Sequence, residues 1–484
     1  MRRNRRIGRI FAAALMAVTS VAVTAALPAQ ASPGTLKLFA VDPDVTIRHR
    51  EGRPASLNPG VFAAAVGGAF EIHANRAGYG SPIVGSQWAD GAWVRDLDSS
   101  MVDSWRGLRS FIHVRVKGPD GDVIVDRDLD WCPTGWDNQR VDDSGPDVQR
   151  FPMWGCFAMP FSLGTVWGID QGWASPLTSR YGGSTDPVRL NGRDGTYRVR
   201  YSFPQAVIDT FGIDPADAMA KVRVTLETGR GHSSASRRAV PAQQEAAPRV
   251  PIDRDPDPST VPDLIPTPAW SIDITRTRNG PPFLAFASNI WNAGPSPMVV
   301  EGFRRSDSNV MDAYQYFYDG ATPVGRTRAG TFEFDTRHGH HHWHMDQFVR
   351  YDLLNADRTQ IVRSTKQSFC LVPTDAIDLT VENADWQTDF GGGLGTACGG
   401  SDAIWIREVL PVGWGDTYYQ YVAGQSFPIK GLPNGRYYVQ VTANPTEEMI
   451  EASTANNVSL RRVVLRGKAG ERRVIVPPHM GIDH

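Results

Sequence analysis

Five of the chain's eleven histidines lie within seven residues, in the segment 337–352, RHGHHHWHMDQFVRYD. In an extended strand successive side chains alternate between the two faces, so His340, His342 and His344 would point to the same side. The bulky residues that follow, Phe348 to Leu354, favour a strand. Three imidazoles on one face predict a metal site. An all-nitrogen ligand set suits copper, zinc or nickel, with the highest intrinsic affinity for Cu(II).

The spacing of these histidines also predicts a distortion of the strand. Same-face Cα atoms lie about 6.6 Å apart, which separates His340 from His344 by about 13 Å, so a bend or bulge is expected where the rings converge. A helix is less consistent, because pairs such as His338/His341 would compete with His340/His344. A non-specific metal-sequestering tract or an expression tag could have the same composition. This run, however, is internal, contains Trp343 and leads into an apolar strand.

Residues 1–31 have the composition of a cleaved secretory signal peptide. Five arginines precede an apolar run from Phe11 to Leu27, and residues 29–31 form an A-x-A cleavage motif. The paired arginines leave twin-arginine export open beside the general route. Without these five arginines the net charge changes from −2 to −7, which argues against a nucleic-acid partner. No later stretch is long and apolar enough to span a bilayer, so we expect a secreted protein without a transmembrane anchor.

A proline-rich segment divides the rest of the chain. Residues 229–262 combine prolines and charges with few large apolar residues, which is typical of a linker. The segments on either side, 33–228 and 263–484, contain short alternating apolar runs separated by Gly, Pro, Asn and Asp. This pattern predicts an all-β fold class, with two antiparallel β-sandwich domains in tandem.

The two segments also share weak similarities in the same order along the chain. One example is DGTYRV at 194–199 and NGRYYV at 434–439. We therefore predict that the segments are diverged copies. The first has Asp103, Trp105 and Gly107 at the positions of the three histidines, and we interpret it as an accessory or binding domain that holds no catalytic metal.

The four cysteines form two local pairs, Cys132/Cys156 and Cys370/Cys398. In an exported protein, paired cysteines more often form disulfides than bind a metal. We predict one disulfide in each half of the chain.

Further motifs surround the histidine segment in a fixed order. DLIPTP at 263–268 precedes it, and the motifs after it are KQSFCL at 366–371, GWGDTY at 413–418, GRYYVQV at 435–441 and NNV at 456–458. This ordered set resembles the catalytic domain of the lysyl oxidases over residues 263–466. The H-x-H-x-H strand followed by D-x-F and Y-D-L-L is its most specific part. Compared with the animal enzymes, one residue fewer separates the last histidine from the Met-Asp pair, and the first domain has no counterpart.

The resemblance implies copper-dependent amine oxidation. With O2 as the oxidant, the reaction would convert a primary amine, either free or the side chain of a lysine-bearing protein, into an aldehyde and release ammonia and hydrogen peroxide. The implied copper ligands are His340, His342 and His344, and the implied cofactor is lysine tyrosylquinone made from Lys366 and Tyr418. Such a quinone supplies the electrophilic carbonyl and the electron sink that no ordinary side chain has.

This chemistry also requires a base that removes a proton from the substrate. Asp346 is favoured because it shares strand parity with the histidines, although it could instead orient a ligand imidazole. Asp416, beside Tyr418, is the second candidate. Two other functions stay open: a His₃ zinc enzyme with hydrolytic or hydration chemistry, and an exported, non-catalytic metal-binding or adhesive protein. Neither of them needs Lys366 or Tyr418.

Overall fold

The computed structural model describes most of the chain after the predicted signal peptide, which lies outside the described residues. The described ranges are 33–153, 156, 159–178, 188–191, 193–229, 247–276, 280–305, 309–335, 342–364, 369–387, 394–401, 403–422, 424–468 and 471–482. Within them, no helix is long and apolar enough to cross a membrane.

The described residues of the first half form four sheets and one helix, and none of these sheets includes a strand of the second half. The sheet orders are β1-β4-β12-β10, β11-β5-β6-β7, β13-β3 and β2-β15-β14-β8-β9. The elements are β1 (Thr35–Ala40), β2 (Asp44–His49), β3 (Ala55–Ser56), β4 (Val61–Val66), β5 (Phe70–Asn75), β6 (Val84–Ala89), β7 (Ala92–Asp96), β8 (Leu108–Lys117), β9 (Val123–Trp131), β10 (Gln139–Arg140), β11 (Gly164–Ile169), β12 (Trp173–Pro176), β13 (Arg189–Leu190), β14 (Gly195–Ser202), α1 (Gln205–Phe211) and β15 (Met219–Thr228).

Where the structure describes it, the second half forms three sheets and a short 3₁₀ helix. The orders are β16-β18-β27-β25, with β17 and β28 also on β18, then β22-β21-β20-β19-β26 and β24-β23-β29-β30-β31. The elements are η1 (Pro258–Thr260), β16 (Leu264–Pro266), β17 (Trp270–Arg276), β18 (Pro282–Asn292), β19 (Met298–Arg304), β20 (Val310–Asp319), β21 (Thr322–Asp335), β22 (His342–Met345), β23 (Val349–Leu354), β24 (Gln360–Arg363), β25 (Asp375–Ala376), β26 (Trp405–Leu410), β27 (Trp414–Tyr418), β28 (Ser426–Pro428), β29 (Gly435–Ala443), β30 (Val458–Arg466) and β31 (Arg473–Ile475).

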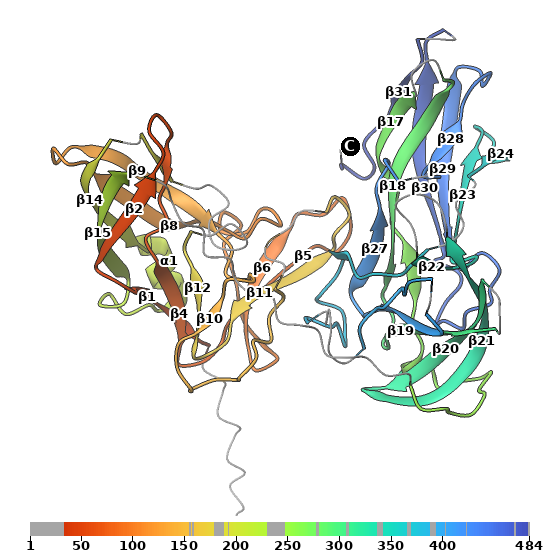
Figure 1. The fold of residues 1–484 in the computed structure, drawn as a ribbon, viewed down its shortest axis with the longest axis horizontal. Helices are drawn as coiled ribbons and strands as arrows, with labels where there is room; N and C mark the ends of the chain where they lie inside the picture. Colours follow the sequence, from red (N-terminus) through yellow and green to blue (C-terminus); the bar gives the residue numbers. More distant parts are fainter. Residues whose placement is uncertain are drawn as a thin grey trace, which may run out of the picture.

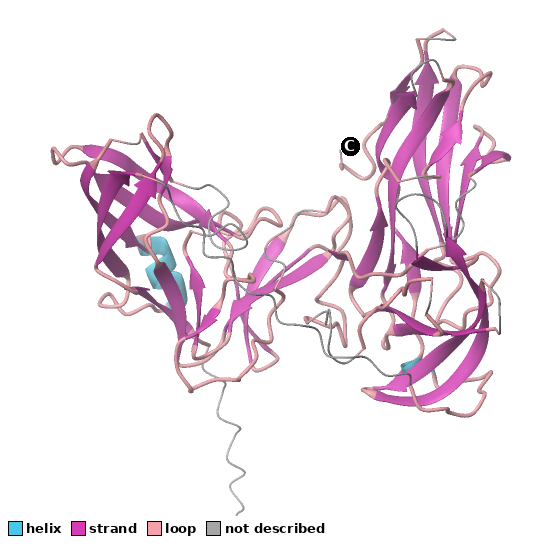
Figure 2. Cartoon of the chain, in the orientation of Figure 1, coloured by secondary structure: helices cyan, strands magenta, loops and turns pink. Residues whose placement is uncertain are grey.

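The predicted all-β fold class is confirmed, since strands dominate both halves (Figure 2). Each half has its own large buried apolar core, one built around Phe111 and Trp131 and the other around Trp343 and Tyr351. Figure 1 shows the two groups of sheets side by side, with β5, β6 and β11 of the first nearest the second. The strand pairs between named elements are antiparallel except β2–β15, which is parallel. The sandwich assignment and the domain limits stay predictions.

The described part of the predicted linker is bonded to the second half. Arg326 in β21 donates its backbone N–H to Pro251 O and its Nε to Val250 O, and Asp253 N donates to Arg326 O. The N–H of Ala247 donates to the buried carboxylate of Glu301 in β19. Residues 247–253 are therefore anchored on the second group of sheets, while residues 230–246 lie outside the described part of the chain.

Two sheets, one in each half, have the strand order that a duplication would leave. The order β9-β8-β14-β15 in the first half corresponds to β24-β23-β29-β30 in the second. In both, a tyrosine near the start of the third strand donates its hydroxyl to the carbonyl four residues earlier: Tyr197 to Arg193 O at 2.7 Å and Tyr437 to Pro433 O at 2.8 Å. This correspondence supports the predicted duplication, which itself stays a prediction.

Both predicted disulfides are confirmed. Cys132 is bonded to Cys156, and Cys370 to Cys398, with Cα–Cα distances of 5.7 and 5.9 Å. Each bridge lies within one half of the chain, and no described cysteine is free.

Backbone hydrogen bonds and packed aromatic rings join the two halves. Leu163 N donates to Ile377 O at 2.6 Å, and Leu379 N donates to Gly164 O at 3.0 Å, so the start of β11 pairs with the segment that follows β25. Phe161 packs with Trp270, and Phe151 with Trp414. The segment 377–379 also donates from Ile377 N and Asp378 N to Gly413 O, next to β27. The first half is therefore hydrogen-bonded to residues 377–379, which are in turn hydrogen-bonded to the residue next to β27.

Gly164→Ala is expected to lower the free energy of unfolding by about 1–3 kcal/mol, a typical cost of overpacking. A Cβ at this position would overlap Asp378 Oδ1 and Thr380 Oγ1, which are already hydrogen-bonded to each other. Gly78→Ala is the matched control, because a Cβ there meets no atom within 4 Å. Denaturant unfolding measures both. Equal stability of the two variants would contradict this account of the interface.

Candidate functional site

The histidine strand β22 lies at one end of its sheet and pairs with β21. His342 lies opposite Asp335, and His344 lies opposite Glu333. The predicted alternation is confirmed for the two described histidines, because their rings meet on one face with 2.8 Å between the two Nε2 atoms. Trp343, between them, points to the other face and is fully buried in the apolar core. His340 lies outside the described residues.

An acidic side chain stands behind the inner histidine. His344 is only 2% exposed, and its Nδ1 lies 3.4 Å from Asp335 Oδ2. This contact places a carboxylate beside the nitrogen on the far side of the ring from Nε2. The alternating pattern therefore presents the Nε2 atoms of His342 and His344 together, with Asp335 beside the other nitrogen of His344.

The spacing of these nitrogens fits a transition metal. Two metal–nitrogen bonds of about 2.0 Å at a right angle place the nitrogens about 2.8 Å apart. That is the separation of the two Nε2 atoms of His342 and His344. In the absence of a metal these two atoms share a hydrogen bond. Imidazole nitrogens suit copper, zinc and nickel alike, so the two described histidines fit a transition metal of this group, copper included.

Asp346 lies just beyond the histidine strand, in a turn rather than in the strand. Its N–H donates to Thr331 O at 3.0 Å, and Thr331 Oγ1 donates to its Oδ2 at 3.3 Å. Burial and the neighbouring Glu333 carboxylate raise the pKa of Asp346 to about 6. The next residue, Gln347, has φ +58°, which turns the chain toward β23. A carboxyl group in this environment can exchange a proton near neutral pH.

A cavity of about 760 Å³ opens at this turn. Three carboxylates line it, and its lining residues are Arg328, Gly330, Thr331, Glu333, Asp346, Gln347 and Glu448. An acidic recess attracts a cation such as a protonated amine. The candidate base therefore lies in a recess with the charge that an amine substrate needs.

Tyr418 ends β27, which lies between β18 and β25. Its hydroxyl donates to Cys370 O at 3.1 Å, and its ring packs edge-on against Phe369 with 4.3 Å between centroids. Burial raises the pKa of the Tyr418 phenol well above its ordinary value, and the carboxylates of Asp416 and Glu408 act in the same direction. The tyrosine is therefore held neutral and fixed in place.

Phe369 brings this tyrosine to the histidine strand. Its backbone pairs with Met345 in β22 through N–H···O bonds of 2.6 and 3.1 Å, while its ring contacts Tyr418. Two of the predicted site segments thus share one neighbour, although more than seventy residues of sequence separate His342 from Tyr418. Lys366, three residues before Phe369, lies outside the described residues.

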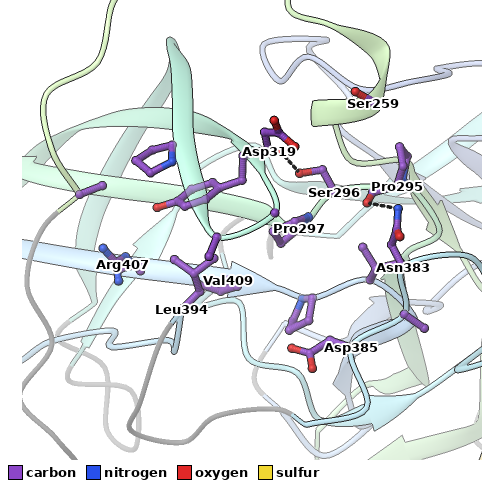
Figure 3. A pocket seen from close by; sticks show the side chains of 18 of the residues that line it. Ser259, Pro295, Ser296, Pro297, Asp319, Asn383, Asp385, Leu394, Arg407 and Val409 are labelled. Carbon is purple, nitrogen blue, oxygen red and sulfur yellow. Dashed lines mark hydrogen bonds between the residues drawn. The ribbon is translucent and has the colours of Figure 1, made fainter. Parts of the chain in front are cut away.

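A larger cavity, of about 940 Å³, contains none of the predicted site residues. It is lined by five prolines, Leu394, Val409 and other side chains (Figure 3). Three of its polar side chains are hydrogen-bonded within the protein: Ser296 donates to Tyr318 O, Asn383 donates to Pro295 O, and Arg407 is bonded to Glu301. Because none of the predicted site residues lines this cavity, we place the site at β22 and β27.

Comparison with known proteins matches the same part of the chain to one family. The lysyl oxidase family model matches residues 319–473, which include β22, β27 and every predicted site residue. Over residues 319–473 the chain is therefore similar to the lysyl oxidase family. The match begins later than the predicted start at residue 263 and ends close to the predicted end at 466.

Curated lysyl oxidases are distant relatives of this chain. Lysyl oxidase homolog 2 of Gallus gallus is 32% identical over 161 residues, which are 33% of this chain and 18% of the relative. Lysyl oxidase homolog 3B of Danio rerio is 32% identical over 120 residues, 25% of this chain and 13% of the relative. Lysyl oxidase homolog 2 of Homo sapiens is 26% identical over 204 residues, which are 41% of this chain and 24% of the relative. The chain thus spans less than a quarter of the length of these relatives.

Two acidic residues near the site were not found from the sequence. Asp335, behind His344, ends β21 and gives no motif of its own. Glu408 is 0% exposed in β26, where it follows the buried Arg407 in an otherwise apolar strand. A charged residue inside an apolar strand was the available signal for Glu408, because buried carboxylates are rare without a partner. The second base candidate, Asp416, is also buried, on the same strand as Tyr418.

Proposed function

We propose that the chain is a secreted copper-dependent amine oxidase that converts primary amines, O2 and water into aldehydes, ammonia and hydrogen peroxide. The observation that carries this proposal is that one residue, Phe369, contacts both the histidine strand and Tyr418. Phe369 pairs with the histidine strand through its backbone and contacts Tyr418 through its ring. The match of residues 319–473 to the lysyl oxidase family model supports the same reaction class.

Copper would be held by His340, His342 and His344. Asp335 orients His344, and the N–H of Trp343 is tied to Cys398 O, so the strand is held on both edges. Lys366 and Tyr418 would provide lysine tyrosylquinone. When bound, copper and this quinone supply the carbonyl electrophile and the electron acceptor that passes electrons to O2.

The chain's own residues would bind the amine and move its protons. Glu333 and Glu448 attract the protonated amine to the cavity, and Asp346 accepts a proton from the substrate carbon next to nitrogen. Partial burial gives Asp346 the basicity for this role. The substrate is a small primary amine or a lysine-bearing protein, and export would bring the enzyme to substrates outside the cell.

Asp346→Asn is expected to retain copper and quinone but to lower turnover by roughly 10²–10⁴, because the amide cannot accept the proton. Amine-dependent hydrogen peroxide release measures turnover, and metal analysis checks the copper. If the variant loses copper instead, Asp346 orients the metal site. Unchanged activity would transfer the role of base to Asp416.

Peptide mass mapping of aerobic, copper-loaded protein tests the proposed function. We expect the peptides containing Lys366 and Tyr418 to be covalently joined, and the same sample to release hydrogen peroxide when an alkylamine is added. If the two peptides are separate and unmodified in a sample that still oxidises amines, the proposed cofactor is wrong. Tight zinc binding without oxidase activity would favour the hydrolytic alternative.

A further inference from the structure

The histidine strand is held on its second edge by two residues next to one disulfide. β22 is the edge strand of its sheet, with β21 on one side. On the other side Trp343 N donates to Cys398 O at 3.0 Å, and Met345 pairs with Phe369. Phe369 immediately precedes Cys370, the disulfide partner of Cys398. The disulfide therefore joins the two chain segments that hold this edge of the strand.

The same disulfide adjoins the candidate cofactor tyrosine. Cys370 O accepts the hydroxyl of Tyr418 at 3.1 Å, and the Phe369 ring supports the tyrosine ring at 4.3 Å. Movement of Cys370 relative to Cys398 would thus change the position of Tyr418 relative to the histidine strand. Fixing these two cysteines together fixes the two parts of the site together.

Glu408 is hydrogen-bonded to the residue that follows Cys370. Its Oε2 accepts the N–H of Leu371 at 2.9 Å. One peptide group, between Cys370 and Leu371, therefore bonds Tyr418 through its carbonyl and Glu408 through its N–H. Glu408 is 0% exposed, its Oε1 has no hydrogen-bond partner in the part of the chain that the structure describes, and a carboxylate oxygen lies within 4.8 Å of both sulfur atoms.

Stability alone does not account for a carboxylate in this place. Burial of a carboxyl group with one unsatisfied oxygen destabilises a fold, and such groups are rare unless they have a role. Here the acid lies directly behind the peptide that holds the Tyr418 hydroxyl. Its geometry suits a positioning residue.

We propose that the Cys370–Cys398 disulfide and Glu408 together position Tyr418 against the histidine strand. This inference rests on the proposed function, in which Tyr418 must react beside the metal. The disulfide sets the spacing between Phe369 and β22, and Glu408 sets the orientation of the peptide that accepts the Tyr418 hydroxyl. Misplacement by about 1 Å can slow a positioned reaction by about 10²-fold.

The first test removes this disulfide and compares it with the other one. Cys370→Ser/Cys398→Ser is the test variant, and Cys132→Ser/Cys156→Ser is the matched control. The two bridges span 28 and 24 residues, so removal of either one should raise the entropy of the unfolded chain by a similar amount. Only the test variant should affect the site. We expect it to form the quinone at least about tenfold more slowly after copper addition, with the control within about twofold of the parent.

The surroundings of Tyr418 can also be measured in metal-free protein, independently of enzyme activity. Tyrosine labelled with ¹³C at Cζ gives one resonance per ring, and Tyr418→Phe identifies the Tyr418 signal. We expect this signal to shift and broaden in the test variant and to match the parent in the control. Identical Tyr418 signals in both variants would overturn the proposal, whatever the activity.

Glu408 variants test the second half of the proposal and cover the case in which the disulfide variant fails to fold. Glu408→Gln keeps an acceptor for Leu371 N–H, whereas Glu408→Leu removes it at similar volume. We expect the Tyr418 signal and the rate of quinone formation to be retained with glutamine and lost with leucine. Equal behaviour of the two variants contradicts the role of Glu408. If the parent protein forms no quinone, the proposed function fails, yet the Tyr418 signal still decides whether these residues position the ring.

Discussion

Tyr418→Phe is expected to bind copper normally, to form no quinone and to oxidise no amine. The phenol oxygen is the atom that the proposed cofactor chemistry needs, while His342 and His344, two of the proposed copper ligands, lie on a different strand. The substitution removes one hydrogen bond, to Cys370 O, which contributes about 0.5–1.5 kcal/mol to stability. The fold should therefore persist. Visible absorbance, metal analysis and hydrogen peroxide release measure the three properties on one sample.

Tyr437→Phe is a matched control for this prediction. The Tyr437 hydroxyl also donates to a backbone carbonyl, Pro433 O at 2.8 Å, so both variants lose the same kind of bond. The control should keep quinone and activity. Lys366→Arg should behave like Tyr418→Phe, because a guanidinium stays protonated and cannot add to a ring as an amine. Quinone absorbance in either Tyr418→Phe or Lys366→Arg would exclude that residue from the cofactor.

Local patterns in the sequence predicted the strand that carries the histidines and the face they share. The alternation rule depends only on backbone geometry, so His342 and His344 meet as expected. The same rule placed Asp346 on that strand, whereas the strand ends at Met345 and Asp346 lies in a turn bonded to Thr331. Turn formation depends on contacts from β21 that the sequence pattern does not encode.

Local sequence patterns could not predict which distant segments of the chain lie in contact. The meeting of Tyr418, Phe369 and β22 joins segments far apart in the sequence, and only the family resemblance brought Tyr418 and the histidines into one site. Asp335 and Glu408 act through side chains that are polar in composition but buried by the fold. Their surroundings, rather than their identity, make them candidates for function.

His344→Ala is expected to abolish copper binding and, with it, quinone formation. The imidazole is 2% exposed, faces His342 at 2.8 Å and is backed by Asp335, so its loss removes a ligand and leaves a buried carboxylate without its neighbour. Affinity should fall by more than the roughly 10–100-fold typical of losing a residue that only orients a ligand. Asp335→Asn should show that smaller loss. Competition with a copper chelator measures both.

His341→Ala is the matched control, since strand alternation predicts that His341 faces away from His340, His342 and His344. It removes an imidazole from the same run, so non-specific metal binding by a histidine-rich tract would fall equally in His341→Ala and His344→Ala. A specific site predicts that only His344→Ala loses stoichiometric copper. If both variants lose copper to the same extent, the run is a sequestering tract, and the positions of Tyr418 and Asp346 lose their link to a metal.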